Sequence, residues 1–186
     1  MDNPDILKNT NISLRALEPE DLEVLYRWEN DPAVWHLSGT LVPYSRYLLK
    51  QYLENARKDI FELKQLRLII QLNGERNGET RPVGAIDLFD FDPYHRRAGV
   101  GILVAEPSDR RKGYAREALD SLMKYCFDVL KLRQIWCNIA EGNRKSLKLF
   151  TSAGFQVVGE KKDWLFNGEG YESEWLLQFI SPHTPE

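Results

Sequence analysis

Hydrophobic residues recur along this chain with two different periods, and these periods predict strands and helices in a definite order. Alternating apolar and polar residues, and short apolar runs between turn residues, predict strands. These strands are residues 12–17, 66–72, 83–90, 97–104, 134–139, 155–160 and 171–180. Apolar residues three and four positions apart predict helices, which begin at Pro19, near Tyr44, near Tyr114 and at Asn143. This order predicts a mixed α/β fold in which helices flank a central, mixed and twisted sheet, rather than a regular βαβαβ series.

Capping and breaking residues mark the ends of the predicted helices. Pro19 is followed by two acidic residues in the first turn, where negative charge suits the helix dipole. Asn30-Asp31-Pro32 predicts the end of this first helix. The strongest helical pattern lies in residues 114–129, where one face carries Ala115, Ala118, Leu119, Leu122 and Cys126.

Composition and charge narrow the class of protein. With 186 residues, of which 42% are hydrophobic and 28% charged, the chain is expected to form one domain over residues 1–186. The net charge of -3 argues against nucleic acid as a partner, because such proteins present a basic face. No apolar run approaches the roughly 18 to 20 residues that span a bilayer, and the polar residues 1–5 do not resemble a signal peptide. We therefore expect a cytoplasmic protein without membrane contact.

Cysteines and histidines show no spacing typical of a metal site. Cys126 and Cys137 both lie inside apolar segments and are expected to be buried thiols in a reducing compartment. The histidines are scattered along the chain at His36, His95 and His183. No bound metal is expected.

A basic turn that contains a glycine joins the strand 97–104 to the helix that begins at Tyr114. The turn consists of Arg110, Arg111, Lys112 and Gly113. The first N–H groups of a helix have no partner within it, and the dipole adds positive charge there, so a pyrophosphate can bind if the backbone comes close enough. Basic side chains at a helix start oppose the dipole, which favours a bound anion over the alternative of a solvated basic turn. The turn is not a Walker motif, because no Gly-Lys-Ser/Thr is present.

The segment Arg110-Arg111-Lys112-Gly113-Tyr114-Ala115 resembles the R/Q-x-x-G-x-G/A signature of the GNAT superfamily of N-acetyltransferases. The resemblance implies the acyl-CoA N-acyltransferase fold, acetyl-CoA as co-substrate, and a pyrophosphate held by this turn, with Arg116 adding charge on the same side. It also implies that the preceding strand pairs with the pantetheine arm through its backbone. That role falls to Ile102, Leu103 and Val104.

Residues 143–155 resemble a second pattern of the same family, N-x-x-[SA]-x-x-L-Y-x-x-x-G-F. Asn143 also suits a helix N-cap, and Gly154 suits the position just after a helix, so structural interpretations stand beside the functional ones. The resemblance implies that Asn143 contacts the pantetheine arm and that Phe150 lies at the cofactor. Phe150 departs from the pattern, because many members carry a tyrosine there that protonates the leaving thiolate, and phenylalanine has no proton to donate. A water or another hydroxyl group is then needed.

The resemblance extends to the acceptor side of the family. Residues 86–98 and 167–171 are similar to the spermidine/diamine acetyltransferases and to the ribosomal-protein N-terminal acetyltransferases. This similarity implies direct attack by an amine within a ternary complex, with a small amine, diamine or polyamine as acceptor. The alternatives are a peptide amine, such as the N-terminus of a ribosomal protein, and a non-catalytic acetyl-CoA-binding sensor. A homodimer or higher homo-oligomer is what the family suggests.

Acetyl transfer to an amine requires a proton acceptor, because an alkylamine with a pKa near about 10 is protonated at pH 7. Asp87 is the candidate base, since strand alternation places it on one face with the apolar residues Ala85 and Phe89. Burial on an apolar surface strengthens a carboxylate as a proton acceptor. An ion-paired, partly exposed aspartate is the alternative, with Asp90 or water as other bases. By resemblance, the Val104 backbone N–H would stabilise the oxyanion.

The charge of residues 35–50 bears on the choice of acceptor. This segment contains Arg46 and Lys50 but neither aspartate nor glutamate. A polycation needs opposing charge along its length, because each unpaired ammonium taken from water costs several kcal/mol. A monoamine or a peptide amine is therefore expected to be a better acceptor than spermidine.

Overall fold

A seven-stranded sheet forms the centre of the protein in a computed structural model that describes residues 6–38, 41–74, 78 and 80–182. The strand order is β1-β2-β3-β4-β5-β7-β6. Neighbouring strands are antiparallel except for β4 and β5, which run parallel. The bounds are β1 Ile12–Arg15, β2 Leu66–Leu72, β3 Pro82–Asp92, β4 Arg97–Val104, β5 Gln134–Ala140, β6 Gln156–Phe166 and β7 Tyr171–Ile180. The predicted mixed α/β fold with a twisted central sheet is confirmed.

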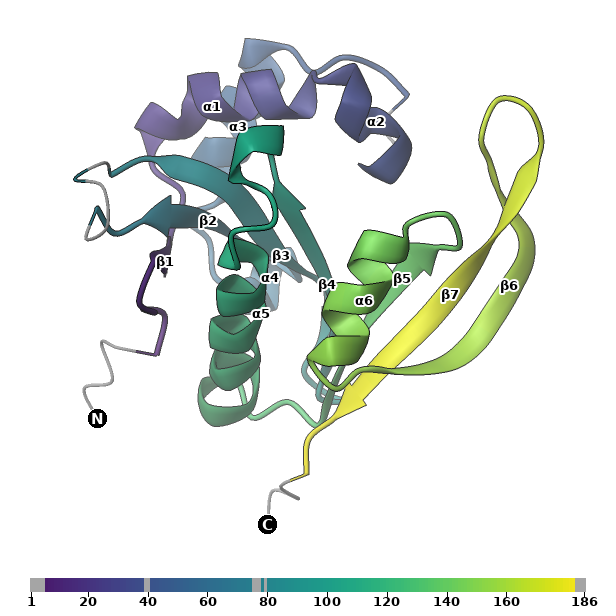
Figure 1. The fold of residues 1–186 in the computed structure, drawn as a ribbon. Coiled ribbons are helices and arrows are strands. Elements are labelled where there is room, and N and C mark those ends of the chain that lie inside the picture. The colour runs from purple at the N-terminus through teal and green to yellow at the C-terminus, as the bar shows by residue number, and fades with distance from the viewer. Residues whose placement is uncertain (1–5, 39–40, 75–77, 79, 183–186) are drawn as a thin grey trace.

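Helices cover both faces of this sheet (Figure 1). On one face, α5 (Tyr114–Lys124) and α6 (Arg144–Ser152) pack on the larger core. On the other face, α1 (Leu22–Glu29) and α3 (Arg46–Asn55) pack on β2 and β3 through a smaller core. Two short helices, α2 (Pro32–Ser38) and α4 (Ile60–Leu63), complete this half of the chain. The amphipathic helix predicted from Tyr114 is confirmed, and its last turn is a π-helical segment, Tyr125–Val129.

The predicted end of the first helix is confirmed, because α1 ends at Glu29, and Pro32 then begins the short helix α2. Proline suits the first turn of a helix, because its missing N–H has no partner there in any case. The Asp31 carboxylate accepts a hydrogen bond of 2.9 Å from the N–H of Ala33, as an N-cap does. Asn-Asp-Pro therefore ends one helix and starts the next.

The two halves of the sheet separate between β4 and β5. The two strands pair only from Arg97 to Gly99 and from Gln134 to Trp136, although β4 continues to Val104 and β5 to Ala140. Figure 1 shows β5 and the β6–β7 hairpin turning away from the first half of the sheet. The sheet thus has an opening between β4 and β5, next to the starts of α5 and α6.

Candidate active site

The backbone of β4 directs polar groups that do not bond to β3 toward this opening. Ala105 donates its N–H to the Val83 carbonyl at 3.0 Å, which makes these two residues a hydrogen-bonded pair of the β3–β4 ladder. Such pairs alternate along antiparallel strands, so Leu103 also bonds to its partner on β3, Ala85. The N–H and C=O groups of Ile102 and Val104 then point the other way, toward the place that β5 has left.

This alternation distinguishes Leu103 from the other two strand residues predicted to bind pantetheine. The backbone of Leu103 is used by β3, and its side chain packs against the smaller core. The polar groups of Ile102 and Val104 face the opening between the strands, and pantetheine binding by these two residues remains a prediction. An extended chain that contains amides can pair with them as a missing strand would.

The turn after β4 brings backbone N–H groups to the end of the opening. Gly113 precedes α5 in the left-handed region, with φ of 91°, and a Cβ placed there would meet no atom within 4 Å. Arg111 is also left-handed, with φ of 66°. Free N–H groups at the start of α5 and open space over Gly113 form a cradle that fits a pyrophosphate.

The basic side chains of the turn also hold it in shape. The Arg110 guanidinium donates to the carbonyls of Val104 at 3.0 Å and Ala105 at 2.8 Å, which ties the turn to the end of β4. Lys112 lies 3.4 Å from the buried Asp109 carboxylate. Arg116 pairs with Asp120 at 2.9 Å and donates to the Ser152 carbonyl of α6. These hydrogen bonds and ion pairs fix the geometry of the turn, and the predicted contacts of the three side chains with the cofactor remain predictions.

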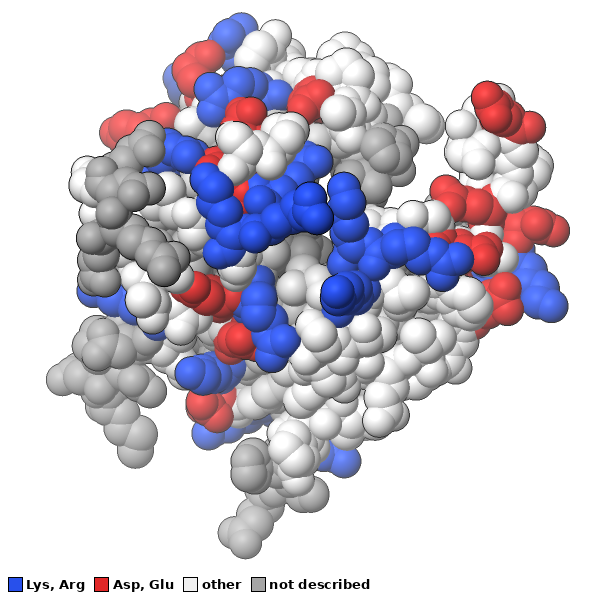
Figure 2. Space-filling view, viewed as in Figure 1, with Lys and Arg blue, Asp and Glu red and all other residues white. Residues whose placement is uncertain are grey.

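Positive charge continues from the start of α5 to the start of α6. Figure 2 shows lysine and arginine side chains gathered across the face of the molecule between these two helix starts. The first turns of α6 carry Arg144, Lys145 and Lys148. Coenzyme A carries three phosphate groups, so a net acidic chain with a basic patch at the opening suits such an anion.

Asp109 supports the cradle from the protein interior. Its side chain is 1% exposed and accepts two hydrogen bonds from Arg81, at 2.7 and 2.8 Å. The Arg81 hydrogen bonds, with the charges of Arg81 and Lys112, lower the pKa of Asp109 below its usual value of 3.8, against the effect of burial. The loop that carries Gly113 is therefore linked to the start of β3 through a buried ionised group.

Asp109→Asn is expected to lower the free energy of unfolding by about 2 kcal/mol at pH 7, less than for a fully buried pair because Arg81 is one-third exposed. A lowered folded-state pKa stabilises the fold above the unfolded pKa, and this stabilisation is lost as pH falls through the folded value. Urea denaturation should show the gap between wild type and variant closing below about pH 4. The exposed-pair control Asp120→Asn should cost about 0.5 kcal/mol. A gap that persists in acid would contradict this assignment.

Asn143 and Phe150 lie on α6, which borders the opening from the β5 side. The Asn143 side chain accepts a hydrogen bond of 3.1 Å from the Ser146 N–H, so its structural role as N-cap is confirmed. Phe150 is buried, with 3% of its surface exposed, and packs edge-to-face on Phe155. The cofactor contacts predicted for these two residues remain predictions.

The candidate base Asp87 lies in an ion pair rather than on an apolar surface. Arg67 of β2 donates to both carboxylate oxygens, at 2.6 and 3.1 Å. The other end of the same guanidinium contacts Glu29 at the end of α1. The ion-paired alternative for Asp87 is thus the observed one, because the β2–β3 register sets Arg67 directly opposite Asp87. Two carboxylate oxygens offer about four acceptor positions, so Asp87 can still accept a proton or an N–H.

Asp87 also borders the opening. Its partner on β4 is Gly101, which lies just beyond the last residue that pairs with β5. Gly101 has no side chain to cover the carboxylate, and a Cβ there would lie 3.9 Å from an Asp87 oxygen. The reserve candidate Asp90 lies apart on an exposed bulge, with φ of 48°.

A cavity of about 550 Å³ opens on the same face of the sheet as Asp87. Trp136 of β5 lies in its wall, pairs with Gly99, and packs edge-to-face on Phe89. Phe89 is two residues from Asp87 on β3, so strand alternation places both on one face. The cavity is otherwise lined mainly by polar side chains of β3 to β7.

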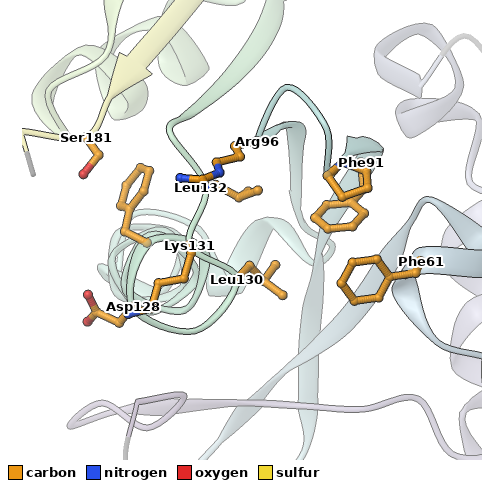
Figure 3. Close-up of a pocket in the computed structure, with 10 residues that line it drawn as sticks. Phe61, Phe91, Arg96, Asp128, Leu130, Lys131, Leu132 and Ser181 are labelled. Atoms are coloured by element: carbon orange, nitrogen blue, oxygen red, sulfur yellow. The ribbon is translucent and has the colours of Figure 1, made fainter. Parts of the chain in front are cut away.

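A second cavity, of about 600 Å³ (Figure 3), lies where β3 turns into β4. Phe61, Phe91 and Leu132 line it together with Arg96 and Lys131. Arg96 precedes β4, whereas the cradle follows the other end of that strand, roughly 26 Å away at 3.3 Å per residue. We do not assign this cavity to the reaction.

Glu29, Arg67, Arg81 and Asp109 are site residues that the sequence analysis did not identify. Arg67 leaves one signal, because it is a charged residue in the apolar segment Leu66–Leu72. Its partners lie 20 and 38 residues away along the chain, so only the fold reveals the cluster. Within the described residues, no helix is long and apolar enough to cross a membrane, and no group of His, Cys, Asp or Glu has the arrangement of a metal site.

Comparison with known proteins gives consistent results. Residues 11–156 match the family model of the acetyltransferase (GNAT) domain. Spermidine N(1)-acetyltransferase of Escherichia coli is 28% identical over 163 residues, which cover 86% of this chain and 81% of that protein. The enzyme of the same name from Vibrio cholerae is 26% identical over 170 residues, covering 88% and 90%. A crystal structure of spermidine N-acetyltransferase from Vibrio cholerae with CoA and spermine shares the fold, with a TM-score of 0.81, 22% identity, and coverage of 92% of this chain and 96% of that one.

Proposed function

Because this chain belongs to the GNAT family of acetyltransferases and is an acetyl-CoA-dependent N-acetyltransferase, we propose that it acetylates the primary amine of a small molecule by direct attack within a ternary complex. One observation carries this proposal. The opening between β4 and β5 has an anion cradle at its end and the Asp87 carboxylate at its side. A long anionic thioester and an amine can therefore meet in one place.

Each part of the site has a role in this proposal. Acetyl-CoA supplies the acetyl thioester. The turn around Gly113 and the start of α5 hold the pyrophosphate, while Ile102 and Val104 pair with the pantetheine arm. The Val104 N–H donates to the developing oxyanion, where an oriented backbone dipole is worth several kcal/mol in a water-poor site.

Asp87 prepares the amine for attack. An alkylammonium must lose a proton before it is a nucleophile, and the Asp87 carboxylate accepts that proton directly or through one water. The departing thiolate needs no strong acid, because a free thiol has a pKa of about 8.5. Phe150 provides no proton, so water or another hydroxyl group protonates the thiolate after it leaves.

The acceptor is proposed to carry one ammonium group. The names of the Escherichia coli and Vibrio cholerae relatives place spermidine among the amines to be tested. We expect spermidine to show a KM above about 1 mM, the upper end of the usual range, because residues 35–50 contain no carboxylate. The measurement is kcat/KM for spermidine, an aromatic monoamine and a short N-terminal peptide in one buffer at one ionic strength. A clear preference for spermidine would show that this charge argument is wrong.

Two further proposals accompany this function. A structure of the Vibrio cholerae spermidine N-acetyltransferase is described as dodecameric, and we propose that this chain also forms a homo-oligomer. The second candidate function is an acetyl-CoA sensor without turnover, and the buried Phe150 in place of a proton donor favours it. Amine-dependent release of thiol separates the sensor from the enzyme.

A further inference from the structure

Arg67 links two carboxylates that come from different elements of the fold. Its guanidinium lies 2.5 Å from Glu29, at the end of α1, and 2.6 Å from Asp87 on β3. All three side chains are largely buried, with 23%, 19% and 27% of their surfaces exposed. Tyr52 of α3 covers the group, with its ring centre 5.6 Å from the guanidinium carbon. This arrangement is a packed cluster and not a solvated surface pair.

The charges of this cluster can be counted. Two carboxylates and one guanidinium sum to one negative charge. Burial opposes the charge on Arg67, but the attraction and hydrogen bonds of Asp87, with Tyr52 and Glu29, raise the pKa of Arg67 above its usual value. Burial raises the pKa of Tyr52 as well, so this phenol stays neutral. The guanidinium is therefore a permanent cation between the two acids.

The cluster lies where the acceptor must arrive. Asp87 faces the opening beside Gly101, and Arg67 lies behind it, on the side away from β4. An ammonium that approaches Asp87 meets one unit of unbalanced negative charge. A second ammonium on the same molecule would need the position between Asp87 and Glu29, which Arg67 already occupies.

The acids that line or adjoin the nearby cavity do not supply the negative charge that a second ammonium group would need. In the adjoining cavity Asp92 pairs with Arg97 at 3.4 Å. Glu174 pairs at 2.7 Å with Lys161, which also lines this cavity. Asp90 is exposed to solvent at the rim. An exposed carboxylate contributes only about 0–1 kcal/mol to binding a cation.

We propose that Arg67 is a specificity-determining residue, whose guanidinium takes the place of a second substrate ammonium and restricts the acceptor to amines with one positive charge near the reacting nitrogen. This inference rests on the proposed function, because it assumes that the amine binds beside Asp87. Removal of Arg67 should turn the cluster into a site for a diammonium, since Glu29 and Asp87 would both be left without a cation.

The test compares butylamine with 1,4-diaminobutane, which differ by one ammonium group. Isothermal titration calorimetry at pH 8 on the coenzyme A-loaded protein gives both Kd values without turnover. Wild type should bind butylamine at least as tightly as the diamine. Arg67→Met should improve the Kd of the diamine relative to butylamine by at least about tenfold, whereas Arg67→Lys, which keeps the charge, should behave as wild type. Arg46→Met is the matched control. Arg46 of α3 forms an exposed pair with Glu23 of α1, and these two helices also carry Tyr52 and Glu29.

The outcomes distinguish this inference from the function on which it rests. A folded Arg67→Met protein with an unchanged ratio of Kd values would overturn the inference, as would a wild type that already prefers the diamine. If Arg67→Met melts below the assay temperature, Glu29→Gln tests the inference instead. This variant leaves the cluster with no net charge, so butylamine binding should weaken severalfold. An unchanged Kd in Glu29→Gln would also overturn the inference. Failure of wild type to acetylate any amine contradicts the proposed function alone.

Discussion

Asp87→Asn is expected to lower kcat by about 100-fold, the usual contribution of a general base, while the Kd for acetyl-CoA stays near the wild-type value. The asparagine amide has nearly the same shape as the carboxylate but cannot accept the amine proton. Asp87 contacts the opening beside Gly101 and not the cradle around Gly113, so cofactor binding should be spared. The measurement is steady-state turnover together with calorimetric titration of acetyl-CoA.

The control for this variant must separate chemistry from folding, because Asn at position 87 also weakens the contact with Arg67. A thermal melt shows whether the variant is folded at the assay temperature. Asp90→Asn changes the exposed neighbour on the same strand and should retain turnover near that of wild type. Full activity in folded Asp87→Asn, with a loss in Asp90→Asn, would transfer the role of base to Asp90. Full activity in both variants would assign it to water.

Gly113→Asp is expected to weaken acetyl-CoA binding at least tenfold, or about 1.4 kcal/mol. A side chain at Gly113 would meet no protein atom, but the φ of 91° strains any residue other than glycine. The part of the loss that exceeds this backbone strain comes from a carboxylate placed against the pyrophosphate. Raising the salt concentration should reduce the defect, since ions screen the repulsion.

Gly113→Asn is the matched control for this prediction. Asparagine has the size of aspartate and carries the same backbone strain at this position, where φ is 91°, but it has no charge. Calorimetry should therefore show Gly113→Asn closer to wild type than to Gly113→Asp. Equal affinities of wild type and Gly113→Asp for acetyl-CoA would show that the pyrophosphate does not bind at this turn.

Local patterns in the sequence predict the fold well, including the turn and helix that follow β4. The helix from Tyr114 and the basic turn before it are both encoded within about twenty residues, and the structure has them as predicted. Asn30-Asp31-Pro32 marks the end of α1 as predicted, but the pattern does not show that Pro32 also starts α2, because proline after Asn-Asp is compatible with both. The sequence also could not reveal the opening between β4 and β5, since strand pairing depends on tertiary contacts.

The acceptor side of the site depends on register, which a single sequence does not specify. Strand alternation correctly indicates that Asp87 shares a face with Phe89, but it gives no partner for the carboxylate. Arg67 becomes that partner only because β2 and β3 align these two residues, and a shift of one position would turn Arg67 to the opposite face. Glu29 joins the cluster through the packing of α1 on the sheet.

The central claim is that this chain transfers acetyl groups from acetyl-CoA to an amine while both are bound. Thiol release should be measured at several concentrations of acetyl-CoA and of a reactive monoamine, with mass spectrometry of the product. We predict negligible release without amine, one N-acetylated amine for each thiol released, and double-reciprocal lines that intersect, as in a ternary complex. Parallel lines would indicate an acetylated enzyme instead of direct attack, and a chain that binds acetyl-CoA but releases no thiol with any amine would be a sensor and not an enzyme.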